Sequence, residues 1–402
     1  MKCRVAYLFL MLLMACGCVD DSYMGALGDS FGVGNQSIPV LVSYGDPSGG
    51  MVKGAGAVDG AMVGVERTVY VYAFSKGEGA DYRKQSKTSP YECLLDASRT
   101  ESGSLAGRKA ILEFKDTYAR WTDDEELFYP TGKYRRMTYD FFSYYLDDAN
   151  KSFGAYTRTE ESVAVKVAID GTQDLMCAKA EVPQTQLEPF SEIEQEMIQE
   201  SAYGFYTAQR NIVPVFNMKH KLVRLEFEML PGVVKEENKI ITVHSIEVES
   251  KYIGSFVVAA KDTAALGITF EDSMRRMKLT EEGGLPMEQD KYIIRTRPDN
   301  SVKAEAQKIG GCVLAAPDME YNAYILMSEV LEDGSVVVTR AETPVKIAYG
   351  PDAFKMGNQY KVKLTIYGAN MVTIDVEMEK WKTGGWLSVD MDKEMEKKDI
   401  NY

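Results

Sequence analysis

Residues 371–381 read MVTIDVEMEKW, and this stretch decides the fold class of the chain. Apolar and polar residues alternate along it, as in a β-strand with one face against a core and the other in water. The alternation predicts an inward face of Val372, Ile374, Val376 and Met378 and an outward face of Thr373, Asp375, Glu377 and Glu379. The C-terminal part of the chain is therefore predicted to be β-structure.

Similar segments recur through most of the chain. The stretch TVYVYAF at residues 68–74 is almost entirely β-branched or aromatic, a composition that favours strands. Further strands are predicted at 109–114, 163–169, 221–229, 240–248, 252–259, 321–327, 335–339 and 359–367. Many short strands with turn residues between them indicate an all-β protein built as two antiparallel β-sandwiches in series.

Residues 181–212 interrupt this pattern. Ser191 and Glu194 form a capping box, and Ile193, Met197 and Ile198 give a helical apolar face. We expect a short acidic helix in the connection between an N-terminal sandwich at 67–212 and a C-terminal sandwich at 213–402.

The N-terminus predicts export. Lys2 and Arg4 precede the apolar run 5–15, which is shorter than the roughly 20 residues that span a bilayer, so residues 1–15 are predicted to be a signal peptide. The run ends in LMACGC, which resembles a lipobox, with Cys16 as the lipidated residue and Cys18 as the alternative. An ordinary secreted protein remains open, although no A-x-A site stands nearby. Residues 16–66 are then a leader and linker that carries one strand-like piece, 38–44.

Composition excludes several classes of function. The chain has 402 residues and a net charge of −14, which disfavours nucleic acid as a partner because phosphate binding needs clustered Lys and Arg. Beyond the leader only Cys93, Cys177 and Cys312 remain, too few for a disulfide framework and too scattered for a metal site. The two histidines, His220 and His244, lie inside strand patterns. We therefore expect no catalytic residue, no metal and no cofactor.

Three other stretches each allow a functional interpretation and a structural one. The glycines of 28–37 have no following helix or lysine for a phosphate, so this stretch is predicted to be linker. The acidic pairs 123–124 and 147–148 could bind Ca²⁺ but lack its ligand spacing, so we expect solvated turns. The aromatic block 128–145 could stack on sugars, but at a period of two half of its rings must face a core.

In its order of motifs the chain resembles the Bacteroidia fimbrillin family, the lipoprotein-derived pilins that include the Mfa-like proteins. The resemblance extends over essentially the whole length. Its elements are the lipobox at Cys16, the short strand 38–44 followed by MVKGAG, TVYVYAF at 68–74, FYPTGKY and YDFFSYY within 128–145, DGTQDLMCA at 170–178, FNMKHKL at 216–222 and the terminal strand that ends in Trp381.

The resemblance implies two transthyretin-like sandwiches and a stalk, tip or anchor subunit of a cell-surface fimbrium. It further implies an outer-membrane lipoprotein with palmitate on its cysteine, whose first strand a trypsin-like protease removes so that a strand of another subunit can replace it. In this sequence the cut falls after Lys53, with Arg67 as the alternative; family members more often have Arg there, which leaves the protease open.

The implied partners are other fimbrial subunits, the outer membrane and host or bacterial surface ligands involved in adhesion. Residues 386–391 (WLSVDM) are a candidate donor strand. If no cut occurs, the resemblance implies a lipid-anchored accessory subunit. A surface lipoprotein that binds glycans is the alternative function, and a hydrolase is a weaker one.

Overall fold

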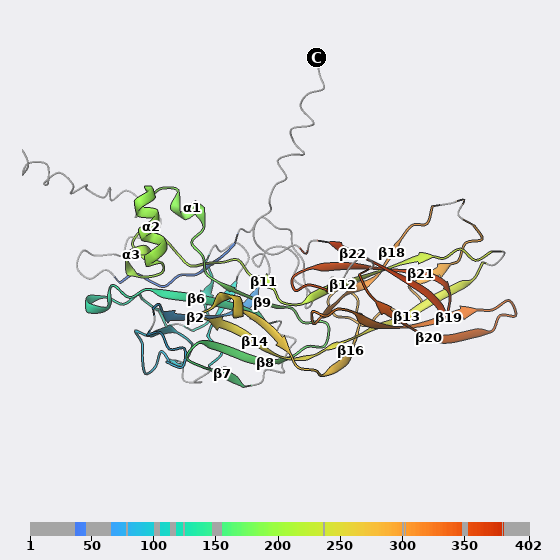
Figure 1. Cartoon of the computed structure of the whole chain (residues 1–402), viewed down its shortest axis with the longest axis horizontal. Helices are drawn as coiled ribbons and strands as arrows, with labels where there is room; N and C mark the ends of the chain where they lie inside the picture. Colours follow the sequence, from blue (N-terminus) through green and yellow to red (C-terminus); the bar gives the residue numbers. More distant parts are fainter. Residues whose placement is uncertain are drawn as a thin grey trace, which may run out of the picture. The chain divides into compact units, whose positions relative to one another are not determined.

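The computed structural model describes residues 37–45, 66–77, 79–99, 105–112, 118–123, 125–146, 155–235, 238–299, 301, 303–347, 353–379 and 381. Strands dominate these ranges and join into several sheets (Figure 1), so the predicted all-β class is confirmed. The pairing is antiparallel with two exceptions among the described strands. β1 (Ser43–Tyr44) runs parallel to β10 (Val215–Phe216), and β12 (Val223–Pro231) runs parallel to β21 (Gln359–Gly368), which the prediction of purely antiparallel sheets missed.

The first large sheet has the order β11-β9-β6-β2-β4-β5, with β3 also paired to β2. Its strands are β2 (Arg67–Ser75), β3 (Cys93–Leu95), β4 (Arg108–Leu112), β5 (Arg120–Trp121), β6 (Tyr139–Leu146), β9 (Leu175–Lys179) and β11 (Lys219–His220). The predicted strand 68–74 becomes the centre of this sheet, because its β-branched and aromatic side chains are suited to a strand that is buried between neighbours.

A second sheet of order β15-β14-β8-β7 covers one face of the first. Its strands are β7 (Tyr156–Arg158), β8 (Ser162–Ala168), β14 (Ile253–Ala260) and β15 (Gly267–Phe270). Aromatic rings join the two layers: Tyr144 of β6 meets Phe256 of β14 edge to face, with ring centroids 6.3 Å apart. The two layers therefore share one hydrophobic core.

This second sheet combines strands from distant parts of the sequence. β14 pairs with β8 along its whole length, for example Phe256 opposite Val165, although the helical segment lies between them in the chain. Residues 253–270 thus share a sheet with residues 156–168, and the described residues from Pro39 onward belong to one compact unit. The domain boundary between residues 212 and 213 remains a prediction. It falls between β8 and β14 in the sequence, and these two strands are hydrogen-bonded partners.

The remaining strands form two further sheets, of order β18-β12-β21-β22 and β16-β13-β19-β20, with β17 also paired to β13. Their strands are β13 (Ile240–Lys251), β16 (Met274–Lys278), β17 (Ile293–Arg295), β18 (Gln307–Ala315), β19 (Tyr321–Val330), β20 (Val336–Val345) and β22 (Met371–Glu379), besides β12 and β21. Only Tyr252 separates β13 from β14, so the chain passes from one pair of sheets to the other within a single residue.

β18 was not predicted, and its glycines explain why. Gly310 and Gly311 interrupt the apolar pattern, and a bulge falls at this point of the pairing with β12, between Glu226 and Phe227. Gly310 has a φ of +57°, and a Cβ atom there would lie 2.8 Å from the carbonyl oxygen of Thr280. The position therefore requires glycine. Because glycine has no side chain, it interrupts the pattern by which the strand could have been predicted.

β22 follows the predicted alternation except at its end. Val376 is buried, and Val372 and Ile374 are partly buried against the core. The predicted inward position of Met378 is wrong: its side chain is 66% exposed. β22 is the edge strand of its sheet, and the core that covers its middle ends before Met378, whereas Trp381 just beyond the strand is buried again.

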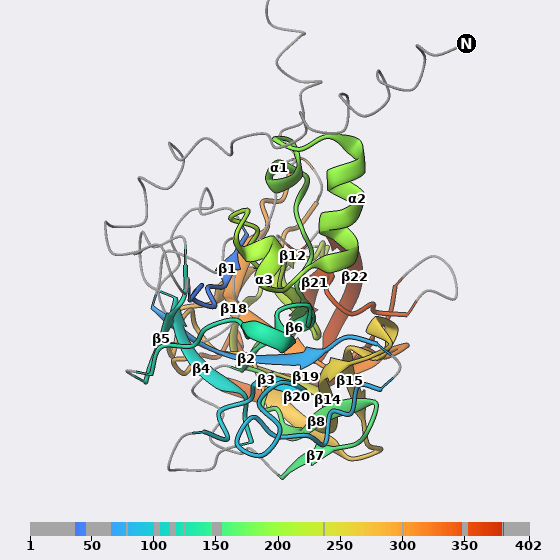
Figure 2. The same ribbon diagram turned by 90° about the vertical axis from the view of Figure 1, so that its left-hand side faces the viewer.

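The helical break between the predicted domains is confirmed. It consists of α1 (Gln184–Leu187), α2 (Glu192–Ser201) and α3 (Phe205–Ala208), drawn in green in Figures 1 and 2, and the only other helical turns in the described ranges are η2 (Gly132–Tyr134) and η3 (Thr263–Ala265). The predicted capping box forms, since Ser191 donates its N–H to Glu194 at 3.0 Å. The predicted apolar face is wrong in part: Ile198 is buried, but Ile193 and Met197 are exposed because α2 rests on the body along one narrow side.

Candidate functional site: the groove that holds residues 39–45

An N-terminal segment of the chain lies in a groove of the body. Val40, Val42 and Tyr44 are buried, at 1%, 0% and 3% exposure, whereas Leu41 between them is only partly covered. This alternation is that of a strand with one face on the body. β1, blue in Figure 2, is the only part of the segment that has regular strand pairing. The predicted strand at 38–44 is thus present in this shorter form.

The main chain of the segment is hydrogen-bonded on both sides. On one side Ser43 and Gly45 donate their N–H groups to the carbonyl oxygens of Pro214 at 2.9 Å and Phe216 at 3.2 Å. On the other side Val40 donates to Leu127 at 2.7 Å, and Ala119 donates to the carbonyl oxygen of Val42 at 3.0 Å. The segment therefore bridges two stretches of the body in the way that an inserted strand does.

Side chains of the groove recognise the segment as well. Tyr44 hydrogen-bonds through its hydroxyl to Ser143 of β6 at 2.6 Å, and its ring lies 5.1 Å from the ring of Phe216. Trp121 of β5 donates its indole N–H to the carbonyl oxygen of Val40 at 3.2 Å. Burial raises the pKa of Tyr44, so this phenol stays protonated at any physiological pH.

The groove lies on the face of β6 opposite the sandwich core. Phe142 and Tyr144 of β6 point into the core, while Phe141 and Ser143 point to the other face and are also buried. The second face is covered by the segment 39–45 and by the helical region, where Tyr203 packs edge to face on Phe141 with centroids 5.7 Å apart. The rings of residues 139–145 are thus packed on both faces of β6, as the packing interpretation predicted, whereas Phe128 of the same block is 37% exposed and Tyr134 is partly buried.

Most of the predicted processing residues lie outside the described residues. These are Cys16, Cys18, Lys53 and the donor candidate 386–391. Arg67, the alternative cut site, is described: it is the first residue of β2, it is partly buried, and it pairs with Leu112 of β4. A protease would have to open the sheet to reach it.

The two histidines have structural surroundings. Nδ1 of His220 lies 3.0 and 3.1 Å from the carboxylate oxygens of Asp174, and the imidazole stacks on Trp381 at 3.7 Å. Both His220 and Asp174 have fully buried side chains, which removes them from contact with a substrate. His244 on β13 bonds through Nε2 to the hydroxyl of Ser328 at 2.7 Å.

The other candidates in the described ranges also have structural roles. Cys93 and Cys177 are buried, and burial raises the pKa of Cys177 to about 11, so this thiol is a weak nucleophile. Asp123 forms an ion pair with Arg108, while Asp124, the pair 147–148 and the glycines of 28–34 lie outside the described residues. Among the described residues no group of three or more His, Cys, Asp or Glu side chains is placed to hold a metal ion.

No helix in the part of the chain that the structure describes is long and apolar enough to span a membrane.

The sequence did not reveal the groove partners Ser143, Trp121 and Phe216, because they come from three separate strands.

Comparison with known proteins gives structural matches without sequence matches. No protein-family model matches the sequence, and no curated protein matches it. The solved structures to which the chain is similar include a fimbrial protein from Bacteroides vulgatus, with 11% identity over 86% of this chain and 100% of that one, at a TM-score of 0.48.

Two further structures come from Porphyromonas gingivalis. The fimbrial anchor protein Mfa2 has 11% identity over 87% of this chain and 99% of its own, at a TM-score of 0.32. The C-terminally truncated tip fimbrial protein Mfa3 has 8% identity over 85% and 99%, at a TM-score of 0.28. All three of these structures are fimbrial proteins, and none shares more than 11% identity with this chain.

Proposed function

We propose that the chain is a structural subunit of a cell-surface fimbrium that is exported as an outer-membrane lipoprotein and assembled by proteolysis-triggered strand exchange. The observation that carries the proposal is the seating of residues 39–45, with main-chain hydrogen bonds on both sides and three buried side chains facing the body. The motif order that resembles the fimbrillin family supports it independently.

The interactions of the segment are of a kind that another strand can reproduce. The hydrogen bonds to Leu127, Pro214 and Phe216 use only main-chain atoms of the incoming strand, so they place no demand on its sequence. The pockets of Val40, Val42 and Tyr44 accept alternate apolar residues, each worth about 1.5–3 kcal/mol of burial. Specificity would therefore come from side-chain fit at alternate positions.

In this proposal, a cut in the linker after the segment is what allows a strand of another subunit to replace residues 39–45. While residues 46–65 join the segment to β2, the segment rebinds within the molecule at an effective concentration on the order of millimolar, which excludes a strand from outside. A cut after Lys53, with the alternative at Arg67, would remove this advantage. Addition of the next subunit then proceeds head to tail and does not close on itself, so a filament grows.

The test uses purified protein that begins at Val19 and limited trypsin treatment. We expect the first cut after Lys53, identified from the mass of the new N-terminal peptide, followed by filaments that electron microscopy detects. Lys53→Ala should stay uncut at this point and monomeric, whereas Lys87→Ala, at an exposed lysine of the body, should assemble like the wild type. An Arg67→Ala variant separates the alternative cut site from the main one.

A body that is trimmed cleanly but stays monomeric at high concentration, alone and mixed with its neighbouring subunits, would contradict the pilin role. Export as a lipoprotein is tested by measuring the mass of the N-terminal peptide of uncut protein recovered from cells. We expect this peptide to begin with an acylated cysteine, at position 16 or alternatively at position 18.

A further inference from the structure

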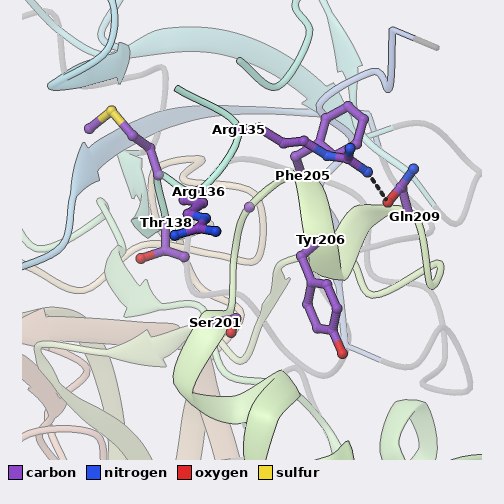
Figure 3. A pocket seen from close by; sticks show the side chains of 9 residues that line it. Arg135, Arg136, Thr138, Ser201, Phe205, Tyr206 and Gln209 are labelled. Carbon is purple, nitrogen blue, oxygen red and sulfur yellow. Dashed lines mark hydrogen bonds between the residues drawn. The ribbon is translucent and has the colours of Figure 1, made fainter. Parts of the chain in front are cut away.

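A second cavity lies away from the groove, between the start of β6 and the end of the helical region. It has a volume of about 500 Å³, within the range of roughly 300–1,000 Å³ that is usual for small-molecule sites. Its lining residues come from two segments, Arg135 to Thr138 and Ser201 to Gln209 (Figure 3). They are Arg135, Arg136, Met137, Thr138, Ser201, Gly204, Phe205, Tyr206 and Gln209.

The two walls of the cavity are fixed to each other. Tyr139 and Tyr203, which are the chain neighbours of the lining residues Thr138 and Gly204, exchange main-chain hydrogen bonds of 2.7 and 3.1 Å, and Thr138 pairs with Gly204. A Cβ atom at Gly204 would lie 2.6 Å from the carbonyl oxygen of Met137, so only glycine lets the walls approach this closely. The cavity is therefore preformed, which lowers the entropic cost of binding.

The polar groups around the cavity are mostly donors. Arg135 donates to the side-chain oxygen of Gln209 at 3.0 Å and lies over the ring of Phe205 at 4.4 Å, which holds its guanidinium in place. Arg136 is exposed, and no carboxylate of the described residues forms an ion pair with it or with Arg135. The hydroxyls of Thr138 and Ser201 complete the polar lining, which contains no acidic side chain.

This positive local charge stands out because the chain as a whole carries −14. Arg210 follows the lining residue Gln209 in sequence and lies over the ring of Tyr206 at 3.8 Å. Its charge also acts on Glu194 of α2, whose pKa is lowered by hydrogen bonds from Ser191 and by Arg210, so the positive charge of the cavity itself comes from Arg135 and Arg136. A concentration of cations at a concave site focuses the potential and attracts small anions even when the net charge is negative. Unpaired guanidinium groups prefer planar oxyanions, which they bind through two parallel hydrogen bonds.

We propose that this cavity binds an acidic sugar residue through its carboxylate. Arg136 would supply the forked contact to the carboxylate, and the hydroxyls of Thr138 and Ser201 and the amide of Gln209 would bond the sugar hydroxyls. Met137 and Tyr206 also line the cavity and provide the apolar surface that the ring carbons of a sugar need. The site does not depend on the fimbrial role, because it shares no residue with the groove of residues 39–45.

The test is binding of two acidic monosaccharides, N-acetylneuraminic acid and glucuronic acid, to the intact body, followed by calorimetry or ligand-observed NMR. The two probes separate a sialylated source from a uronic acid source. We expect binding of at least one of them, weakened by salt, and no binding of the neutral sugar N-acetylglucosamine. Arg136→Gln should weaken binding about tenfold or more, because a hydrogen bond to a charged group is lost.

Arg136→Lys retains the positive charge but cannot form two parallel hydrogen bonds to a carboxylate. Its affinity for the acidic sugar should therefore lie between those of the wild type and Arg136→Gln. The matched control is Arg276→Gln, which alters one of two adjacent exposed arginines on β16 and should leave binding unchanged. The proposal is overturned if neither acid binds at millimolar concentration, or if inorganic phosphate or N-acetylglucosamine binds as tightly as the acids. It is equally overturned if Arg136→Gln keeps both its circular dichroism spectrum and its affinity.

Discussion

At the scale of single residues, one buried ion pair stands out in the N-terminal sheets. Arg158 of β7 donates to the carboxylate of Asp96 at 2.7 Å, with side-chain exposures of 6% and 0%. The other carboxylate oxygen accepts from the hydroxyls of Ser86 and Ser98, each at 2.6 Å. Burial is the largest influence and raises the pKa of Asp96, but these hydrogen bonds together lower it below its ordinary value.

This pair leads to a prediction about stability and pH. Arg158→Met should lower the free energy of unfolding by about 3–5 kcal/mol at pH 7, since it leaves a buried carboxylate without its partner. In the wild type the pKa of Asp96 is lower in the folded than in the unfolded state, so its contribution is present above about pH 4 and is lost as the pH falls through the folded pKa. The difference between wild type and variant should therefore shrink on acidification.

Urea titrations from pH 3 to pH 7 measure this difference. The control is Arg83→Met, whose side chain is 58% exposed in its pair with Asp81, and this variant should lose much less stability. Equal losses in the two variants, or a difference between them that does not change with pH, would show that the charge of Asp96 is not what Arg158 stabilises.

At the scale of elements, the segment 39–45 depends on one anchor more than on the others. Tyr44 contributes a buried ring and the hydrogen bond to Ser143, whereas Val40 and Val42 contribute smaller apolar side chains. A strand held along a single short stretch opens locally without unfolding of the body.

Removal of this anchor should therefore loosen the segment alone. Tyr44→Ala costs on the order of 3 kcal/mol of burial, and we expect the amides of Val40, Ser43 and Gly45 to exchange with solvent about 100-fold faster. Amides in the middle of β12 should keep their protection. Hydrogen exchange followed by mass spectrometry or NMR measures both sets, and Tyr91→Ala, at a tyrosine that is 40% exposed, serves as the matched control. Unchanged exchange at these three amides would mean that the main-chain bonds alone hold the segment.

At the scale of the whole molecule, the two halves of the sequence do not fold into separate sheets. β8 receives its partner β14 from beyond the helical region, so the cover of the first core comes partly from the second half of the chain. Apolar residues of both pairs of sheets join one continuous cluster, from Tyr72 to Trp381. Cooperative unfolding of the body is the expected consequence.

A truncated chain tests this arrangement. Residues 37–212 lack β14 and β15. This leaves one edge of β8 unpaired and deprives its core residues Val163, Val165 and Val167 of the strand that pairs with them. We expect this fragment to bind hydrophobic dyes and to unfold without a sharp transition, while residues 37–402 unfold in a single one. A fragment 37–212 that melts cooperatively would restore the boundary at residue 212 as a real domain boundary.

The sequence predicted correctly what depends on neighbours along the chain. The β-branched and aromatic composition of residues 68–74 and the period-two alternation from residue 371 mark both stretches as strands. Ser191 with Glu194 marks the start of α2, because strand faces and helix caps are decided within a few residues. The alternation pattern gave a wrong prediction at two places. Glycines interrupt it at the bulge of β18, and an apolar residue that continues it is exposed at the end of β22.

Only the tertiary structure decided which strands pair and which faces of the sheets are covered. An alternating strand shows that one face is buried, but it does not show that β14 pairs with β8, that β12 runs parallel to β21 or that both faces of β6 are covered. The groove of residues 39–45 and the arginine-lined cavity are each assembled from segments that are far apart in the sequence. Such sites depend on the fit between side chains of distant segments, and no property of a single segment encodes that fit.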